Sequence, residues 1–187
     1  MSSTTPYDYS QVRVLVVDDN VHMCRLVRAM LNAFGIRQVA DAGDGAEALD
    51  LMDQNQFDVL VVDWEMPVLD GAEFVRLIRK PEHPYGYAPI IMITGHSTYR
   101  RTQEALALGV NDVLCKPFSP KALYMRLADN IAAPRPFIRS PDYFGPKPRL
   151  DKAERDPLSV MESDTGPQDA PPARDAAIDL DEIAAIE

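Results

Sequence analysis

From residue 12 onward, this chain alternates five times between short apolar, β-branched runs and longer segments whose apolar residues recur at helical spacing. The alternation is typical of a parallel sheet with helices on both faces, because a crossover must return the chain to the same end of the sheet before the next strand. The third run, residues 59–62, is continuously apolar, which predicts a central strand buried on both faces. We therefore predict an α/β fold with a five-stranded parallel sheet.

The boundaries of these elements follow from the apolar patterns and from the residues that interrupt them. Strands are expected at 12–17, 38–42, 59–62, 90–93 and 112–115, and helices at about 21–34, 46–54, 71–78, 98–108 and 120–131. Gly35 ends the first helix and Gly71 opens the third. The helical residues expected to face the core are Val21, Cys24, Leu26, Val27, Met30, Leu31 and Phe34 on the first helix, Ala46, Ala48, Leu49 and Met52 on the second, and Phe74, Val75, Leu77 and Ile78 on the third.

The chain changes character after residue 132, where helical periodicity disappears and nine of the sixteen prolines fall. We divide it into an N-terminal tail (1–11), one domain (12–132) and a Pro-rich, charge-segregated extension (133–187) that is expected to be largely irregular and mostly disordered. Residues 135–155 hold six basic and three acidic residues, and 156–187 hold nine acidic and one basic. The first part interleaves aromatic residues with arginines, so it either docks on the domain or a partner, or is a disordered linker.

Composition excludes several classes of protein. The net charge of -10 argues against a general nucleic-acid or anionic-membrane binder. Cys24 and Cys115 each lie in an apolar stretch, which indicates buried thiols in a reducing compartment and no disulfide framework. The first residues lack a basic region followed by an apolar run, and no stretch approaches the roughly 20 apolar residues of a membrane span. We expect a cytoplasmic protein.

Polar residues follow four of the predicted strands at their carboxyl ends. Asp18 and Asp19 follow the first strand, Asp63 the third, Thr94 the fourth and Lys116 the fifth. Because ligands bind outside the carboxyl ends of strands in an open parallel sheet, these side chains should converge on one pocket. Clustered carboxylates repel one another, and Mg²⁺, a hard cation with oxygen ligands, relieves that repulsion. A lysine and a threonine there favour phosphoryl transfer to a carboxylate.

Over about residues 12–131 the chain resembles the response-regulator receiver domains of two-component signalling. The resemblance lies in VLVVDDN with the acidic pair, DVLVVDWEMPVLDG with Asp63, PIIMITGH with Thr94, and GVNDVLCKPF with Lys116. It implies a flavodoxin-like sheet of order 2-1-3-4-5 and a cis peptide bond between Lys116 and Pro117. It also implies that Asp63 accepts a phosphoryl group from a histidine kinase or a histidine phosphotransfer protein.

The same resemblance implies roles for the other site residues. Asp18, Asp19, Asp63 and the backbone carbonyl of Glu65 would hold Mg²⁺, while Lys116 and Thr94 would contact the phosphoryl group. The output would be a contact with a downstream protein of unknown identity, with a possible phosphorylation-dependent dimer. Neither nucleic acid nor membrane is expected as a partner, and no turnover of an external substrate is expected, so the chain is not predicted to be an enzyme.

One position departs from the family pattern, because Val113 stands where the fifth strand usually carries an aromatic residue that moves with the threonine. Tyr99 is a candidate substitute. Glu65 and His96 flank the route of a hydrolytic water, and either they set the lifetime of the acyl phosphate or they are ordinary solvated loop residues.

Two other functions compete with the phosphorylated switch. One is an aspartyl-phosphate phosphohydrolase; such enzymes place nucleophile and general acid two residues apart after one strand, whereas the acidic pair here is adjacent. The other is a receiver that acts as a constitutive scaffold without phosphorylation, which the missing aromatic residue keeps open.

Overall fold

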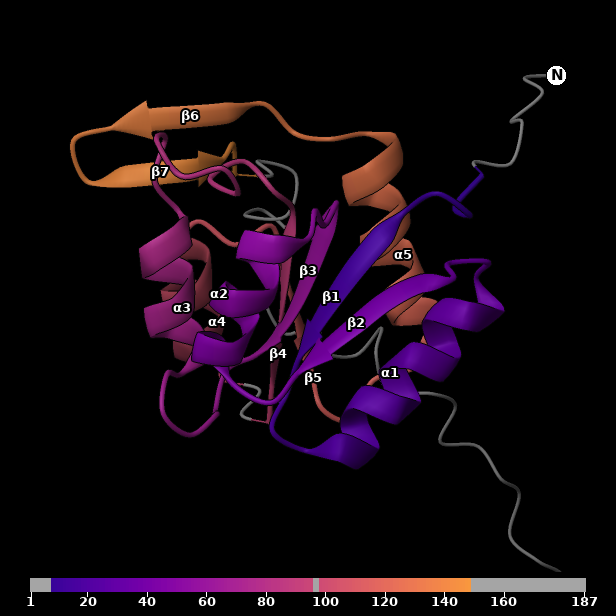
Figure 1. The fold of residues 1–187 in the computed structure, drawn as a ribbon. Coiled ribbons are helices and arrows are strands. Elements are labelled where there is room, and N and C mark those ends of the chain that lie inside the picture. Colours follow the sequence, from indigo (N-terminus) through magenta and orange to yellow (C-terminus); the bar gives the residue numbers. More distant parts are fainter. Residues whose placement is uncertain (1–7, 96–97, 149–187) are drawn as a thin grey trace, which may run out of the picture.

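The computed structural model describes residues 8–95 and 98–148. Five strands alternate with five helices, and a hairpin of two further strands follows the last helix (Figure 1). In chain order the elements are β1 (Arg13–Val17), α1 (Val21–Ala33), β2 (Gln38–Ala42), α2 (Gly45–Gln54), β3 (Val59–Asp63), α3 (Gly71–Ile78), β4 (Ile90–Thr94), α4 (Tyr99–Ala107), β5 (Asp112–Cys115), α5 (Pro120–Ala132), β6 (Phe137–Ser140) and β7 (Tyr143–Pro146).

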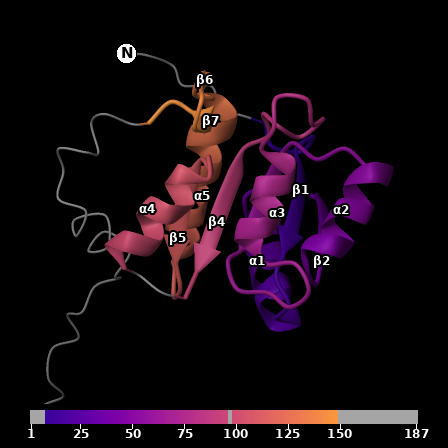
Figure 2. The same cartoon turned by 90° about the vertical axis from the view of Figure 1, so that its left-hand side faces the viewer.

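The first five strands form a parallel sheet in the order β2-β1-β3-β4-β5, which confirms the predicted flavodoxin-like topology. Every residue of β3 is buried, as its unbroken apolar run predicts. Helices α1 and α5 cover one face of the sheet, and α2, α3 and α4 cover the other, as the two views show (Figures 1 and 2).

The pleat of the strands divides the apolar residues between two cores. In β3, Leu60 and Val62 pack with α2 and α3, whereas Val59 and Val61 pack with α1 and α5. Phe74 on α3 is the largest fully buried side chain of the first core. Because both faces of the central strands are buried, their carboxyl ends are held rigidly, and the residues that follow them occupy fixed positions.

Some helical residues expected in the core lie at the surface instead. Val21 and Leu26 on α1 are 59% and 48% exposed, Leu77 on α3 is 43% exposed, and Ala46 on α2 is exposed. Predictions that these residues face the core were wrong. A helix against a sheet buries only a stripe about 100° wide, and these positions lie outside the stripe set on α1 by Cys24, Val27 and Leu31 and on α3 by Phe74, Val75 and Ile78.

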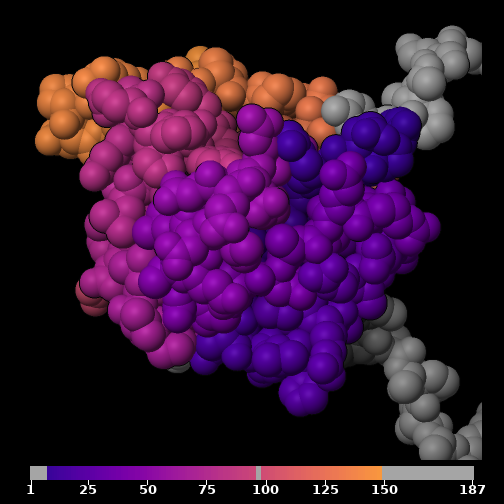
Figure 3. Space-filling model, viewed as in Figure 1, coloured from indigo at the N-terminus to yellow at the C-terminus, as the bar shows by residue number. Residues whose placement is uncertain are grey.

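The hairpin β6–β7 was not anticipated as strands. It is antiparallel and lies at the end of the sheet where the parallel strands begin (Figure 1), and in the space-filling view its orange surface adjoins the magenta surface of the α3–β4 connection (Figure 3). The rings of Tyr87, Phe137 and Phe144 lie within 5.1–5.6 Å of one another, and the Arg79 guanidinium lies 5.1 Å from the Phe137 ring. The described part of the extension therefore packs on the domain.

Two glycines allow this close approach. A Cβ on Gly145 would lie 2.7 Å from the Cα of Gly109, and a Cβ on Gly109 would lie 2.4 Å from the Phe144 carbonyl oxygen. Gly109 also has φ +87°, a backbone conformation that suits glycine. The two backbones meet at a distance that no side chain permits, so the hairpin is seated on the α4–β5 connection.

A buried polar network lies beneath the hairpin at the start of β5. Asp112 accepts a hydrogen bond of 2.7 Å from Asn130 and lies 3.7 Å from Arg126 and 3.9 Å from Arg135. Arg135 also donates to the Asn111 carbonyl, so the residue that leads into β6 is tied to the amino end of β5. Arg79 donates to the Gly86 and Ala88 carbonyls, and burial lowers the pKa of its guanidinium to about 10.

Within the described ranges, no helix is long and apolar enough to cross a membrane. Cys24 is a buried thiol, and burial raises its pKa to about 11, whereas the Cys115 thiol, predicted to be buried, is half-buried. The acidic segment 156–187 lies outside the described residues.

Removal of the hairpin should destabilise the domain. We expect a chain ending at Ala133 to have a free energy of unfolding about 2–4 kcal/mol lower than a chain ending at Pro148, because the aromatic contacts and the contact of Arg135 with Asp112 are lost. Urea denaturation of both chains measures the difference. Equal stabilities would show that the hairpin contributes no packing energy.

Candidate functional site

Three of the five strand-end residues selected from the sequence are buried at the carboxyl end of the sheet, and a fourth is half-buried. Asp18 and Asp63 are 2% and 6% exposed, Thr94 is fully buried and Lys116 is half-buried, while Asp19 is exposed. In the register of the sheet, Val17 pairs with Val62, so the aspartates that follow these residues are neighbours. The structure thus brings together the residues that the strand-end pattern predicted.

Lys116 bridges the two buried aspartates. Its Nζ lies 3.0 Å from Oδ2 of Asp18 and 2.8 Å from Oδ1 of Asp63. Burial disfavours the ammonium charge, but the hydrogen bonds to Asp63 and Asp18 outweigh it and raise the pKa of Lys116. The lysine therefore stays protonated and supplies positive charge to a pocket with an excess of carboxylates.

Asp63 has an environment in which ionisation is costly. Burial raises the pKa of its carboxyl above the ordinary value, and the negative charge of Asp18 acts in the same direction, while the hydrogen bond and charge of Lys116 oppose both. A carboxylate held in this way gains stability from any further cation that approaches it.

Asp18, Asp19 and Asp63 form a candidate cation site. One carboxylate oxygen of each lies within 4.8 Å of the others. Asp18 uses its Oδ1 to accept a hydrogen bond of 2.9 Å from the Asn20 backbone, and Asn20 in turn caps α1, which fixes the loop after β1. Hard oxygen donors with a net negative charge fit a divalent cation such as Mg²⁺.

The loop after β3 is shaped by two backbone features. A Cβ on Gly71 would lie 2.1 Å from the Asp63 carbonyl oxygen, so only glycine allows α3 to begin so close to the end of β3. Val68 has φ 65°, and the Leu69 N–H donates to the Pro67 carbonyl at 2.7 Å, which together form a tight turn of positive φ. Asp70 and Glu73 then form a capping box at the start of α3.

The β4 and β5 ends complete the pocket. Thr94 pairs with Cys115 across the sheet, and its carbonyl accepts a hydrogen bond of 2.8 Å from the Lys116 N–H. The peptide bond between Lys116 and Pro117 is cis, as the family resemblance implied. Val113 is half-buried and packs on the core of α2, α3 and α4, while Tyr99 is 56% exposed at the start of α4. His96 lies outside the described residues.

Sequence reasoning missed one residue beside the site, Arg101 of α4. Its guanidinium lies 4.3 Å from the centre of the Trp64 ring and 3.1 Å from the Glu65 carboxylate. Trp64 and Glu65 directly follow Asp63. The sequence did not distinguish Arg101 from an ordinary surface residue, because an arginine on a charged helix with few apolar residues is usually solvated.

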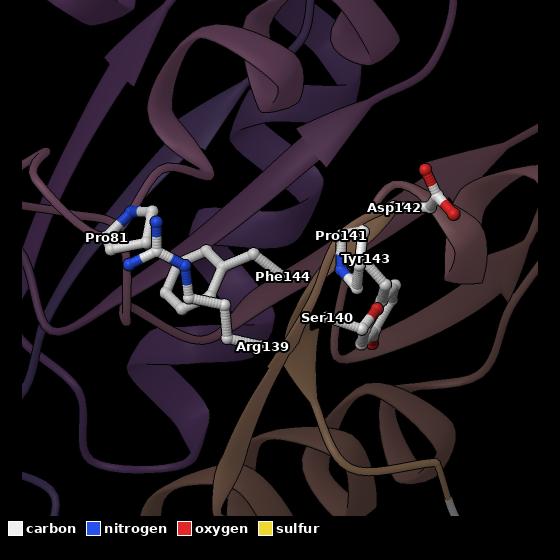
Figure 4. Close-up of a pocket in the computed structure, with 7 residues that line it drawn as sticks. All are labelled: Pro81, Arg139, Ser140, Pro141, Asp142, Tyr143 and Phe144. Carbon is white, nitrogen blue, oxygen red and sulfur yellow. The ribbon is translucent and has the colours of Figure 1, made fainter.

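The described residues also form a shallow cleft of about 550 Å³ at the other end of the sheet, between the hairpin and Pro81. Arg139 and Phe144 lie beside Pro81 there, whereas Asp142 lies apart from them (Figure 4). Its lining holds one carboxylate, Asp142, and no lysine, unlike the group of residues at the carboxyl ends of the strands.

The fold and this arrangement define a class of protein: a doubly wound domain in which a buried aspartate at the end of the central strand faces a lysine and an acidic pair. Comparison with protein-family models matches residues 14–128 to the response regulator receiver domain. The chain belongs to this family of signalling domains. The matched region ends before the hairpin β6–β7.

Individual proteins are similar over the same share of the chain. The chemotaxis protein CheY homolog of Campylobacter jejuni is 39% identical over 119 residues, which cover 63% of this chain and 91% of the relative. The solved structure of the chemotaxis response regulator CheY4 of Vibrio cholerae is 37% identical, with a TM-score of 0.57 over 62% of this chain and 95% of that one.

A second solved structure bears on the acidic cluster. The receiver domain of the sensor histidine kinase PA1611 from Pseudomonas aeruginosa is 32% identical, with a TM-score of 0.59 over 65% of this chain and 98% of that one. That structure has a magnesium ion coordinated in its active site cleft.

Loss of the lysine should leave two buried carboxylates without their partner. We expect Lys116→Met to lower the free energy of unfolding by about 2–4 kcal/mol in chelator, and the exposed Lys121→Met to change it little. Because the variant pocket is more negative, Mg²⁺ should raise its melting temperature more than that of the wild type. Thermal unfolding with and without Mg²⁺ measures both effects; equal stability of the two variants in chelator would contradict the bridging role.

The backbone at Val68 should be strained, because valine rarely adopts a positive φ. A residue that adopts positive φ more readily should relieve this strain. Val68 is 83% exposed, so its replacement loses little buried surface. We expect Val68→Asn to raise the free energy of unfolding by about 1 kcal/mol, since asparagine adopts positive φ more readily than a β-branched residue. Val21→Asn, at an exposed valine of α1, is the control for lost apolar surface, and an equal effect in both variants would argue against strain.

Proposed function

We propose that the chain is a phosphorylation switch in which Asp63 accepts a phosphoryl group from a histidine kinase or a histidine phosphotransfer protein. The observation that carries this proposal is the buried Asp63 carboxylate, 2.8 Å from the Lys116 ammonium at the end of the central strand. In the reaction, an oxygen of Asp63 bonds to phosphorus, and the bond to the donor imidazole breaks. The product is an acyl phosphate.

Lys116 and Thr94 are the groups that we assign to the transferred phosphoryl group. The ammonium of Lys116 is held at the pocket by two carboxylates, so it can exchange one of these contacts for a phosphoryl oxygen. Thr94 ends the adjacent strand β4 and offers a hydroxyl donor at the same edge. Phosphoryl transfer needs mainly positioning and neutralisation of charge, and this pocket supplies both.

Mg²⁺ is the cofactor that we assign to the acidic cluster, with Asp18, Asp19, Asp63 and the backbone carbonyl of Glu65 as its protein ligands. The three clustered carboxylates support this assignment, and the magnesium ion in the similar PA1611 receiver domain is consistent with it. When bound, the ion would neutralise charge on the phosphoryl oxygens and orient them.

Signalling then depends on protein contacts. We propose that residues 12–132 are the receiving unit and that the modified domain acts on a downstream protein, with a phosphorylation-dependent dimer as one form of output. The domain modifies itself and turns over no external substrate, so its purpose is not enzymatic. The thiols of Cys24 and Cys115 suit the reducing cytoplasm, where we place this exchange.

The geometry disfavours the phosphohydrolase alternative. The acid two residues after Asp63 is Glu65, whose carboxylate is 54% exposed and paired with Arg101 at 3.1 Å. A general acid for such chemistry must direct its carboxyl group at the leaving group, whereas the Glu65 carboxylate is engaged by the Arg101 guanidinium.

Intact-mass measurement after incubation with Mg²⁺ and acetyl phosphate tests the switch. We expect one phosphoryl adduct in the wild type and in Asp50→Asn, an exposed aspartate on α2, and none in Asp63→Asn or with chelator. An adduct that persists in Asp63→Asn would place the modification elsewhere. Absence of any adduct in the wild type would support the scaffold function instead.

A further inference from the structure

Helix α4 is attached to the domain by little apolar packing. Of its nine residues only Ala105 is buried, and Leu106 and the capping residue Leu108 pack on the core in part. These contacts lie in the second half of the helix. The first turn needs another attachment, and an element with few buried contacts is the kind that moves at low cost.

Arg101 supplies that attachment. Its guanidinium covers the face of Trp64 at 4.3 Å and pairs with Glu65 at 3.1 Å, although the arginine side chain is only 31% exposed. The backbone of Trp64 is held in place on both sides, because its N–H donates to the Ile93 carbonyl at 2.8 Å and its carbonyl accepts from the Gly71 N–H at 3.0 Å. The first turn of α4 is therefore tied to the two residues that follow Asp63.

The guanidinium has a second carboxylate within reach. Nη1 of Arg101 lies 3.6 Å from Glu104 in the same helix, while Nη2 holds Glu65 in the loop. One pairing ties α4 to the loop, and the other keeps the arginine within its helix. A phosphoryl group on Asp63 is dianionic and lies one residue along the chain from Trp64 and two from Glu65. Its charge therefore changes the strength of the Arg101–Glu65 pairing relative to the Arg101–Glu104 pairing.

We propose that Arg101 is a positioning residue that couples α4 to the phosphorylation state of Asp63 through Trp64 and Glu65. The proposal rests on the proposed function, because it needs a phosphoryl group on Asp63. In the unmodified chain the arginine holds the first turn of α4 against the loop. Phosphorylation changes how the Arg101 guanidinium divides its contacts between Glu65 and Glu104, and the first turn of α4 shifts with it.

Hydrogen–deuterium exchange of residues 99–107 tests this coupling in the full chain, with and without acetyl phosphate and Mg²⁺, while intact mass gives the extent of phosphorylation. Without phosphodonor, we expect Arg101→Ala to speed exchange in α4 about three- to tenfold and to leave α5 unchanged. With phosphodonor, exchange in α4 should change about threefold or more in the wild type and little in Arg101→Ala, at equal phosphorylation.

Arg100→Ala is the matched control. Arg100 is the neighbouring residue of the same helix, its side chain is 89% exposed, and it pairs with Glu104 at 2.9 Å. This variant should keep the wild-type response to phosphorylation. Arg101→Lys keeps the charge but not the planar fork, so it should restore the response in part, which a mere loss of helix packing would not predict.

The outcomes separate the coupling from the function on which it rests. A phosphoryl adduct on every variant, with the same α4 response in Arg101→Ala as in the wild type, would overturn the coupling and leave the switch intact. No adduct on the wild type would overturn the proposed function and the coupling with it.

Discussion

The constraint on which the site depends is the shortage of positive charge between two buried carboxylates. Asp18 and Asp63 follow paired residues of β1 and β3, so the sheet itself forces them together, and Lys116 is the ammonium that bridges them. One lysine does not balance three clustered aspartates, so the pocket carries an excess of carboxylates that an added cation would stabilise. The rigidity of the fully buried β3 and β4 keeps the carboxylates from relaxing apart.

Much of this site could be predicted from the sequence, because it depends on the ends of strands. Once the five apolar runs are placed in a parallel sheet, the residues after them must meet at one edge, and no side-chain detail is needed. Asp18, Asp63, Thr94 and Lys116 were found in this way. Helix faces were predicted less well, since Val21, Leu26 and Leu77 are apolar but lie on the flanks of their helices. An apolar residue near a stripe looks the same in a sequence as one inside it.

The features that sequence reasoning missed depend on contacts between distant segments. The hairpin β6–β7 lies in a Pro-rich stretch with no clear alternation, and its strands pack because Gly145 meets Gly109 and because Phe137 and Phe144 meet Tyr87. Nothing near the hairpin in the chain indicates these partners. Arg101 was missed for a similar reason, since its contact is with Trp64, an aromatic residue in a loop far from α4 in the sequence.

These two unexpected features lie at opposite ends of one helix. Arg101, in the first turns of α4, contacts the loop that follows Asp63, and Gly109, just after the helix, contacts the hairpin through the Phe144 carbonyl. Because α4 has a single buried residue, a shift that begins at Arg101 meets little resistance before it reaches Gly109. Gly109 leaves no free space against the hairpin, so such a shift must either move β6 and β7 or be resisted by them. Under the coupling proposed for Arg101, the hairpin is therefore the next element that a shift of α4 would meet.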